Sequence, residues 1–198
     1  MKFSTKILAS ALLILSANTN AALLTPVSFT ASSSVNNPVN VADNIFPPEG
    51  GQWQTNTAWW TGTTPVIHFS YSQIFNIEDI LLSVDNNDDY SVEYSLDNST
   101  WTNLFSISSS YGEVGWGMDT MSTLSSNPEY IAALDFSPVQ AQFLRIFATG
   151  GDNLYSVGEF QAFGSAVSAV PVPAAAFLFA PALMGFLGFR RKLKNTTA

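Results

Sequence analysis

Five aromatic side chains lie in stretches with the composition of loops, and together they could bind a sugar. Sugars present apolar C–H faces on which aromatic rings stack, while Asn and Asp side chains accept the hydroxyl protons. Trp116 stands between two glycines and is the best exposed of these candidates. For Trp59 and Trp60, closing one end of the fold is an equal alternative to contact with a ligand. The candidate ligand-binding residues are Trp116, Tyr111, Trp59, Trp60 and Trp53.

Residue types that support catalysis are sparse in this chain. His68 is the only His, and a half-buried position in the middle of a strand is its simpler interpretation. The chain has no Gly-x-Ser-x-Gly motif and no phosphate-binding loop. Nothing among its fifteen acidic residues selects the pair that glycosidic cleavage needs. We therefore predict that the protein is not an enzyme, and a weak hydrolase is the least favoured alternative.

Positive charge is concentrated at the two ends of the chain. Two of the seven Lys and Arg residues stand at positions 2 and 6 and four in the range 190–194, which leaves only Arg145 between them. All fifteen acids lie between Asp43 and Glu159. Binding to nucleic acid or to anionic lipid needs clustered cations, so the central region should bind neither. Its charge is compatible with a divalent cation, with neutral glycans or with solubility alone.

Two polar features of the central region have structural interpretations. Arg145 alternates with Leu144 and Ile146, so we expect it on the opposite face of a strand, paired with a carboxylate. The run Asp85–Asp89 has a cation-binding composition but lacks the spacing of an EF-hand, and we predict a polar turn. The chain has no Cys, so disulfides, thiol catalysis and zinc–thiolate sites are excluded.

The sequence pattern between residues 27 and 163, the region that must position these residues, predicts a series of short strands. One short strand is expected in the range 27–31, and Ile67, Phe69 and Tyr71 alternate with polar residues before a polar turn and an apolar run at 77–84. In the range 90–96, Tyr90, Val92, Tyr94 and Leu96 should face one way. A turn at 97–100 should lead to a hairpin partner at 101–107.

The second half of the central region continues this pattern. Glycines among Ser and Thr predict a long mobile loop over 108–127 that displays Tyr111 and Trp116. Further strands are expected at 130–136, 143–148 and 157–163, and no useful helical period appears. Short strands at regular spacing are typical of an all-β sandwich or barrel.

The N-terminus has the pattern of an export signal. Lys2 and Lys6 form a basic region, residues 7–15 are apolar, and small polar residues follow, with a cleavage point after Ala21 or Ala22. We therefore predict that residues 1–22 are a signal peptide.

The C-terminus pairs an apolar run, 174–189, with a basic cluster that would stop membrane insertion. The run is marginal in length for a permanent span, and it would serve as a transient membrane anchor. A plain C-terminal membrane tail is the alternative. The residues of the motif are Val170, Pro171, Val172, Pro173, Arg190, Arg191 and Lys192.

These residues resemble a PEP-CTERM sorting signal of Gram-negative bacteria, with Val172 where the family more often has Glu. The resemblance implies recognition by an exosortase-like processing enzyme in the membrane, cleavage near the Pro motif, and release or attachment at the cell surface. Residues 165–198 would then be a linker and a sorting segment that forms a single hydrophobic helix.

A second resemblance covers nearly all of the central region. Its fragments occur in the order found in discoidin domains of the coagulation-factor C-terminal type. They are Phe29-Thr-Ala-Ser-Ser-Ser, Val41-Ala-Asp-Asn44, Trp59, Tyr94-Ser-Leu-Asp97 with Trp101, Ala141-Gln-Phe-Leu-Arg-Ile146 and Gly158-Glu-Phe-Gln-Ala-Phe-Gly164. The resemblance implies that residues 23–164 form a discoidin-like β-sandwich, a galactose-binding-like jelly roll.

The same resemblance implies several roles for single residues. Related carbohydrate-binding modules hold calcium between an N-terminal Asp loop and a Glu near the last strand, which here are Asp43 and Glu159; two solvated carboxylates are the alternative. Trp101 matches a core position, and Arg145 a structural one. The family often has Asp-Gly where this chain has Asp-Asn at 43–44 and 97–98, but Asn tolerates the left-handed backbone that such turns require. An insert at 45–57 lengthens one binding loop.

Taken together, these features predict an exported surface or matrix protein. It would pass the inner membrane of a Gram-negative bacterium, be processed, and bind a glycan, such as the cell's own exopolysaccharide, through its β-sandwich. The alternative is a structural component of biofilm or cell envelope that acts through protein contacts and binds no sugar.

Overall fold

The computed structural model describes residues 21–167. Residues 1–20 of the predicted signal peptide, the motif residues at 170–173 and 190–192, and the apolar run 174–189 lie outside the described residues. Within residues 21–167 there is no helix with the length and apolarity that crossing a membrane requires.

Strands account for most of the described part, which confirms the predicted all-β class. The only helix within residues 21–167 is the short 3-10 helix η1 (Pro38–Ala42). The strands are β1 (Ala22–Leu24), β2 (Ser28–Ala31), β3 (Ala58–Thr61), β4 (Val66–Asp85), β5 (Asp89–Ser95), β6 (Thr102–Ile107), β7 (Met118–Ser122), β8 (Val139–Gly150) and β9 (Leu154–Ala166).

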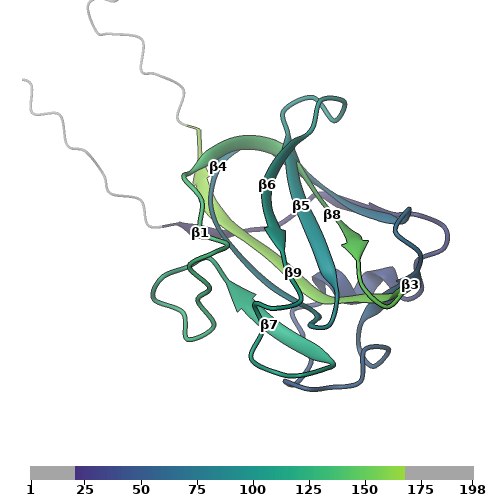
Figure 1. The fold of residues 1–198 in the computed structure, drawn as a ribbon. Helices are drawn as coiled ribbons and strands as arrows, with labels where there is room; N and C mark the ends of the chain where they lie inside the picture. The colour runs from purple at the N-terminus through teal and green to yellow at the C-terminus, as the bar shows by residue number, and fades with distance from the viewer. Residues whose placement is uncertain (1–20, 168–198) are drawn as a thin grey trace, which may run out of the picture. The chain divides into compact units, whose positions relative to one another are not determined.

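The long strand β4 belongs to both layers of the sandwich. Its first part, residues 66–70, pairs with β2 and β8, and β5 and β6 continue this layer beyond β8. Its last part, residues 79–85, pairs with β9 and β7, and β9 also pairs with β1 and β3. The pairing with β8 shifts register between Ser70 and Phe75, where Ser72–Ile74 are exposed. Figure 1 shows β6, β5 and β8 side by side, with β9 running across them.

The core lies between these layers and is rich in aromatic rings. Phe69 on β4 stacks on Phe160 of β9 with ring centroids 4.5 Å apart. Trp60 packs edge-on against Tyr90 at 6.4 Å. Burial of such rings is the main favourable term for a domain that has no disulfide.

The first and last described residues lie beside each other. Ala22 pairs with Gly164 and Leu24 with Ala162, so β1 is held against the C-terminal half of β9. Both of these described ends lie on the left of Figure 1.

Much of the expected strand pattern is confirmed. Ile67, Phe69 and Tyr71 are buried, the hairpin partner of β5 is β6, and strands occupy the ranges expected near β8 and β9. The expected left-handed backbone conformation also occurs at two Asn residues, Asn44 with φ 64° and Asn98 with φ 59°.

Four expectations about the strands are wrong. The polar turn before residue 77 is instead an irregular, exposed part of the continuous strand β4. Residues 130–136 form turns anchored by the buried Leu134. The expected loop 108–127 contains β7, whose residues are buried on both faces except Thr120, so it has no alternation that the sequence could reveal. Leu96 is 51% exposed because β5 ends at Ser95, after a register shift at Val92–Glu93.

The expected role of Arg145 is confirmed. Leu144 and Ile146 are fully buried, whereas Arg145 pairs with Glu93 and its Nε donates to Glu93 Oε2 at 2.7 Å. The guanidinium carbon lies 4.2 Å from the ring centroid of Trp101, which is half-buried rather than fully buried. His68 is half-buried on β4, 5.4 Å from the same Trp101 ring, which agrees with its structural interpretation.

The stacked pair in the core predicts a large stability effect. Phe69→Ala should lower the free energy of unfolding by about 3–5 kcal/mol, because it removes a fully buried ring and leaves a cavity beside Phe160. Urea denaturation measures it. Leu96→Ala, an exposed position, should change stability by less than about 0.5 kcal/mol. Equal effects of the two substitutions would contradict this assignment of the core.

Candidate ligand-binding site

Four loop segments gather at the end of the sandwich away from β1, and we call this the loop end: residues 43–57, 85–89, 108–117 and 150–154. Pairing within the sheet brings them together. Asp89 pairs with Gly150, Thr61 with Leu154, and Gly51 forms an isolated bridge with Met118. All five predicted aromatic candidates lie on or beside these segments.

Trp116 is the most exposed aromatic side chain at the loop end, at 65%. Main-chain bonds hold the segment that carries it. The N–H of Asn86 donates to Gly117 O at 2.9 Å, and the Asn86 side-chain amide donates to Val114 O. Gly117 has φ 81°, and a Cβ there would lie 2.5 Å from Gly51 O, so only glycine fits. Trp116 is therefore presented to solvent on an anchored backbone.

The insert carries a second aromatic pair. Trp53 and Trp59 are half-buried and meet edge to face, with ring centroids 5.5 Å apart. The N–H of Met118 donates to Gly51 O at 3.0 Å, and the N–H of Gly50 donates to Met118 O at 2.8 Å. These bonds tie the segment that carries Trp53 to the one that carries Trp116.

The remaining two candidates point toward the core. Trp60 is 1% exposed and packs against Tyr90 and Tyr155, so it closes the end of the core and cannot contact a ligand. Of the two interpretations for Trp60, the ligand contact is therefore wrong. Tyr111 is half-buried against the core, with part of its surface accessible.

Two carboxylates, one buried on β7 and one on the insert, hold the loop end in place. Asp119, on β7, is 1% exposed and accepts the N–H of Glu113 at 2.7 Å through Oδ2. Glu49, on the insert, accepts the N–H of Thr120 at 3.1 Å. Burial raises the pKa of Glu49 to about 7, helped by a hydrogen bond to Asp119 and by the negative charge of Asp119. Glu49 therefore takes up and releases its proton near neutral pH.

The candidate calcium ligands Asp43 and Glu159 lie close together, outside the loop end's aromatic cluster. Glu159 is 1% exposed, and its Oε2 accepts the N–H of Asn44 at 3.0 Å. Burial raises the pKa of Glu159 to about 7, and the charge of Asp43 adds to this. Asp43 itself is exposed and accepts the N–H of Ile45 at 2.9 Å.

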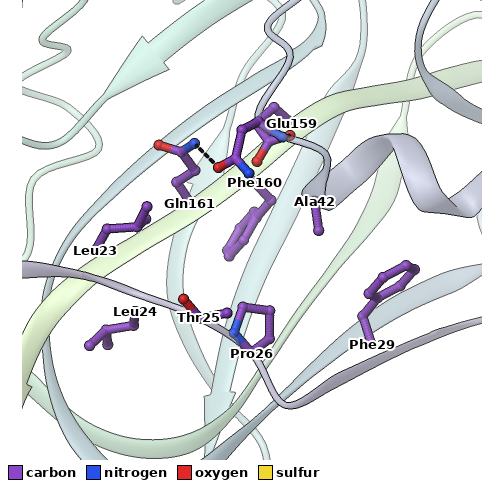
Figure 2. Close-up of a pocket in the computed structure, with 10 residues that line it drawn as sticks. Leu23, Leu24, Thr25, Pro26, Phe29, Ala42, Glu159, Phe160 and Gln161 are labelled. Atoms are coloured by element: carbon purple, nitrogen blue, oxygen red, sulfur yellow. Dashed lines mark hydrogen bonds between the residues drawn. The ribbon is translucent and has the colours of Figure 1, made fainter.

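A cavity of about 180 Å³ adjoins Glu159. Figure 2 shows the Phe160 ring between the polar side chains of Glu159 and Gln161 on one side and Pro26 on the other. The Gln161 side-chain amide donates to Asn44 Oδ1 at 3.3 Å. The other lining residues are Thr25 and the apolar Leu23, Leu24, Phe29 and Ala42.

The sequence did not single out Asn86, Asp119 or Glu49, although they hold the segment that carries Trp116. A Cβ at Gly112 would lie 1.7 Å from Asn86 Oδ1 and 2.0 Å from Asp119 Oδ2, so this glycine packs directly on both side chains. The only signal in the sequence was the polar run that contains Asn86. No group of three His, Cys, Asp or Glu side chains within residues 21–167 is arranged to hold a metal ion.

Comparisons with known proteins show the fold. No protein-family model and no curated protein matches the chain. The CBM32 of AlyQ in complex with 4,5-unsaturated mannuronic acid matches with a TM-score of 0.51 and 18% identity, over 72% of this chain and 98% of that chain. A truncated AlyQ with CBM32 and alginate lyase domains matches with a TM-score of 0.53 and 17% identity, over 79% of this chain and 37% of that chain.

These likenesses show that the chain has the β-sandwich fold of CBM32 carbohydrate-binding modules. The predicted discoidin-like, galactose-binding-like fold class is confirmed to that extent.

The Glu49–Asp119 contact predicts a pH-dependent effect of one substitution. The folded-state pKa of Glu49, about 7, exceeds its ordinary value, so the stability that Glu49 contributes is fully present below that ordinary value and is lost as pH rises through 7. Glu49→Gln keeps hydrogen bonding without the charge. The melting temperature of this variant minus that of the wild type should therefore increase between about pH 5 and about pH 8.

Thermal unfolding followed by circular dichroism gives this difference. Glu113→Gln, which removes an exposed acid from the neighbouring segment, should give the same difference at both pH values. A constant difference for Glu49→Gln would show that the pKa of Glu49 is not raised in the folded state.

Proposed function

We propose that this protein is a non-enzymatic, exported protein that binds an extracellular glycan at its loop end. The observation that carries the proposal is Trp116, a 65% exposed ring on a backbone anchored by Asn86 and Gly51. An exposed aromatic ring offers an apolar face on which a sugar can stack, and a fixed one binds with little loss of conformational entropy. The fold shared with carbohydrate-binding modules supports this function.

Charge restricts the kind of glycan. Arg145 is the only Lys or Arg within residues 21–167, and it is bonded to Glu93 and covered by Trp101. The polar side chains of the loop end are amide, hydroxyl and carboxyl groups, and none of them is basic. Carboxylates repel uronic acids and accept hydroxyl protons from neutral sugars. A neutral polysaccharide, such as an exopolysaccharide of the producing cell, is therefore the ligand class that fits.

Targeting follows from the two ends of the sequence. We propose that the chain crosses the inner membrane of a Gram-negative bacterium, is held transiently through 174–189, and is cut near 170–173 by an exosortase-like enzyme. The adjacency of Ala22 and Gly164 supports this, because cuts at both ends would leave the loop end intact.

Calcium between Asp43 and Glu159 is part of this proposal. The two carboxylates fit calcium in kind, since they are hard oxygen ligands whose charges act on each other. Bound there, the ion would link the segment after η1 to β9. The chemistry that it supplies is charge neutralisation and order in the N-terminal loop.

Trp116 provides the test of glycan binding. Trp116→Ala should weaken binding to the recognised polysaccharide by about tenfold or more, which is the loss of one aromatic contact, and leave the melting temperature unchanged. Glycan arrays and affinity electrophoresis against neutral and uronate-rich polysaccharides, with and without calcium, measure this.

Leu96→Ala is the matched control, because it removes an exposed apolar side chain from a turn outside the loop end and should bind normally. Binding that survives Trp116→Ala would place the ligand elsewhere. No binding to any glycan in any condition would favour the alternative of a structural envelope component that acts through protein contacts.

Processing predicts the mass of the mature protein. Intact-mass measurement of protein recovered from cells should give an N-terminus after Ala21 or Ala22 and a C-terminus near the 170–173 motif. A mass that retains residues 174–198 would show a plain membrane tail, with no processing.

A further inference from the structure

The turn between β4 and β5 carries two carboxylates that are almost completely buried. Asp85 is 3% exposed and Asp88 is 0% exposed. The N–H of Asp88 donates to Asp85 O at 3.3 Å, which closes the turn and places both side chains on it. Within the described residues, Asp85 Oδ1 and Asp88 Oδ2 are buried without a hydrogen-bond partner. Buried carboxylates in proteins are paired, bound to a metal or protonated.

The groups around this turn are acidic or neutral. Asp152, on the turn between β8 and β9, donates its N–H to Asp88 Oδ1 at 3.0 Å. Burial raises the pKa of Asp85 to about 6 and that of Asp88 to about 7, and the charge of Asp152 adds to both. Tyr90 faces Asp88 with its hydroxyl group, and Gly117 faces Asp85 with its main-chain N–H.

No basic side chain within residues 21–167 is free to neutralise this turn. Arg145, the only Lys or Arg there, is bonded to Glu93, and His68 packs on Trp101. The turn therefore carries two buried carboxylates that each have an oxygen without a hydrogen-bond partner, and no basic side chain of the described residues neutralises them.

We propose that the β4–β5 turn binds a divalent cation of the calcium class, with Asp85 and Asp88 as its charged ligands. Calcium accepts six to eight oxygens in irregular geometry, including main-chain carbonyls and waters, so two carboxylates suffice for the charge. Magnesium is a poorer fit, because it requires near-octahedral geometry and gives up its waters reluctantly. This site is separate from Asp43, which follows η1, and from Glu159, which lies on β9.

The site would also stabilise the segment that presents Trp116. Asn86, between the two ligands, bonds to Gly117 O and Val114 O. A cation that fixes the turn therefore fixes the anchor of Trp116, whether or not the loop end binds a glycan.

The test uses the full-length chain, stripped of metal with a chelator, and terbium as a luminescent substitute for calcium. Tyr90 touches the proposed site, and Trp60 and Tyr155 lie 6.4 and 6.2 Å from the Tyr90 ring, so excitation of these rings should sensitise bound terbium. Calcium should displace the bound terbium and so lower its luminescence. Added alone to the metal-free protein, calcium should raise the melting temperature by roughly 5 °C or more. The double variant Asp85→Asn with Asp88→Asn should weaken terbium binding at least about tenfold and reduce the calcium shift, and adding Glu159→Gln to it should abolish whatever shift remains.

Two matched variants locate the site. Asp89→Asn removes a charge from the same turn, but its Oδ1 already accepts the N–H of Ser109 at 2.8 Å, so binding should persist. Glu159→Gln removes the other candidate site and should leave the terbium signal in place. Circular dichroism checks folding; if the double variant does not fold, Asp88→Asn alone is read in the same way.

The proposal is overturned by a wild type that shows neither terbium luminescence nor a calcium shift. It is overturned equally by a signal that is lost in Glu159→Gln and kept in the double variant. A double variant that exceeds the wild type in stability, with and without calcium, would show that the two carboxyl groups are simply protonated.

Discussion

Bonds from main-chain N–H groups to carboxylates hold the loops of this domain in place. Glu159 accepts the N–H of Asn44, and Asp119 accepts that of Glu113, so acids on regular strands fasten irregular segments. Such bonds need no basic partner, which suits a domain whose only Arg is used elsewhere. They also concentrate negative charge in buried positions, and burial raises the pKa of Glu159. Fastening the loops and accumulating uncompensated charge are thus two results of the same interaction.

The sequence predicted the fold wherever a strand has one buried and one exposed face. Arg145 could be placed correctly because its neighbours alternate in polarity. β7 could not be found, since it is covered on both sides and its polar residues are bonded internally. The continuity of β4 was hidden too, because Ser72–Ile74 look like a turn when the exchange of partners between the two layers is unknown. Both failures arise because these features depend on tertiary contacts, about which the local sequence pattern carries no information.

For the candidate site, the sequence found the right end of the fold but could not rank its residues. Trp59 and Trp60 are adjacent, yet Trp60 is in the core and Trp59 is half-buried beside Trp53, because they lie on opposite faces of β3. Trp116 was identified by its flanking glycines. The reason for those glycines differs: a Cβ at 117 would strike the insert, whereas a Cβ at 115 would meet nothing.

The course of β9 determines how the domain would carry a mechanical load. β9 begins at Leu154, beside the loop end, and ends at Ala166, where the chain continues to its tail. A pull between a ligand at the loop end and an attachment beyond Val167 therefore acts along this strand. Because the hydrogen bonds to β4 lie perpendicular to it, they would be loaded together in shear rather than opened one at a time. This geometry would make the strand resistant to a pull between its two ends.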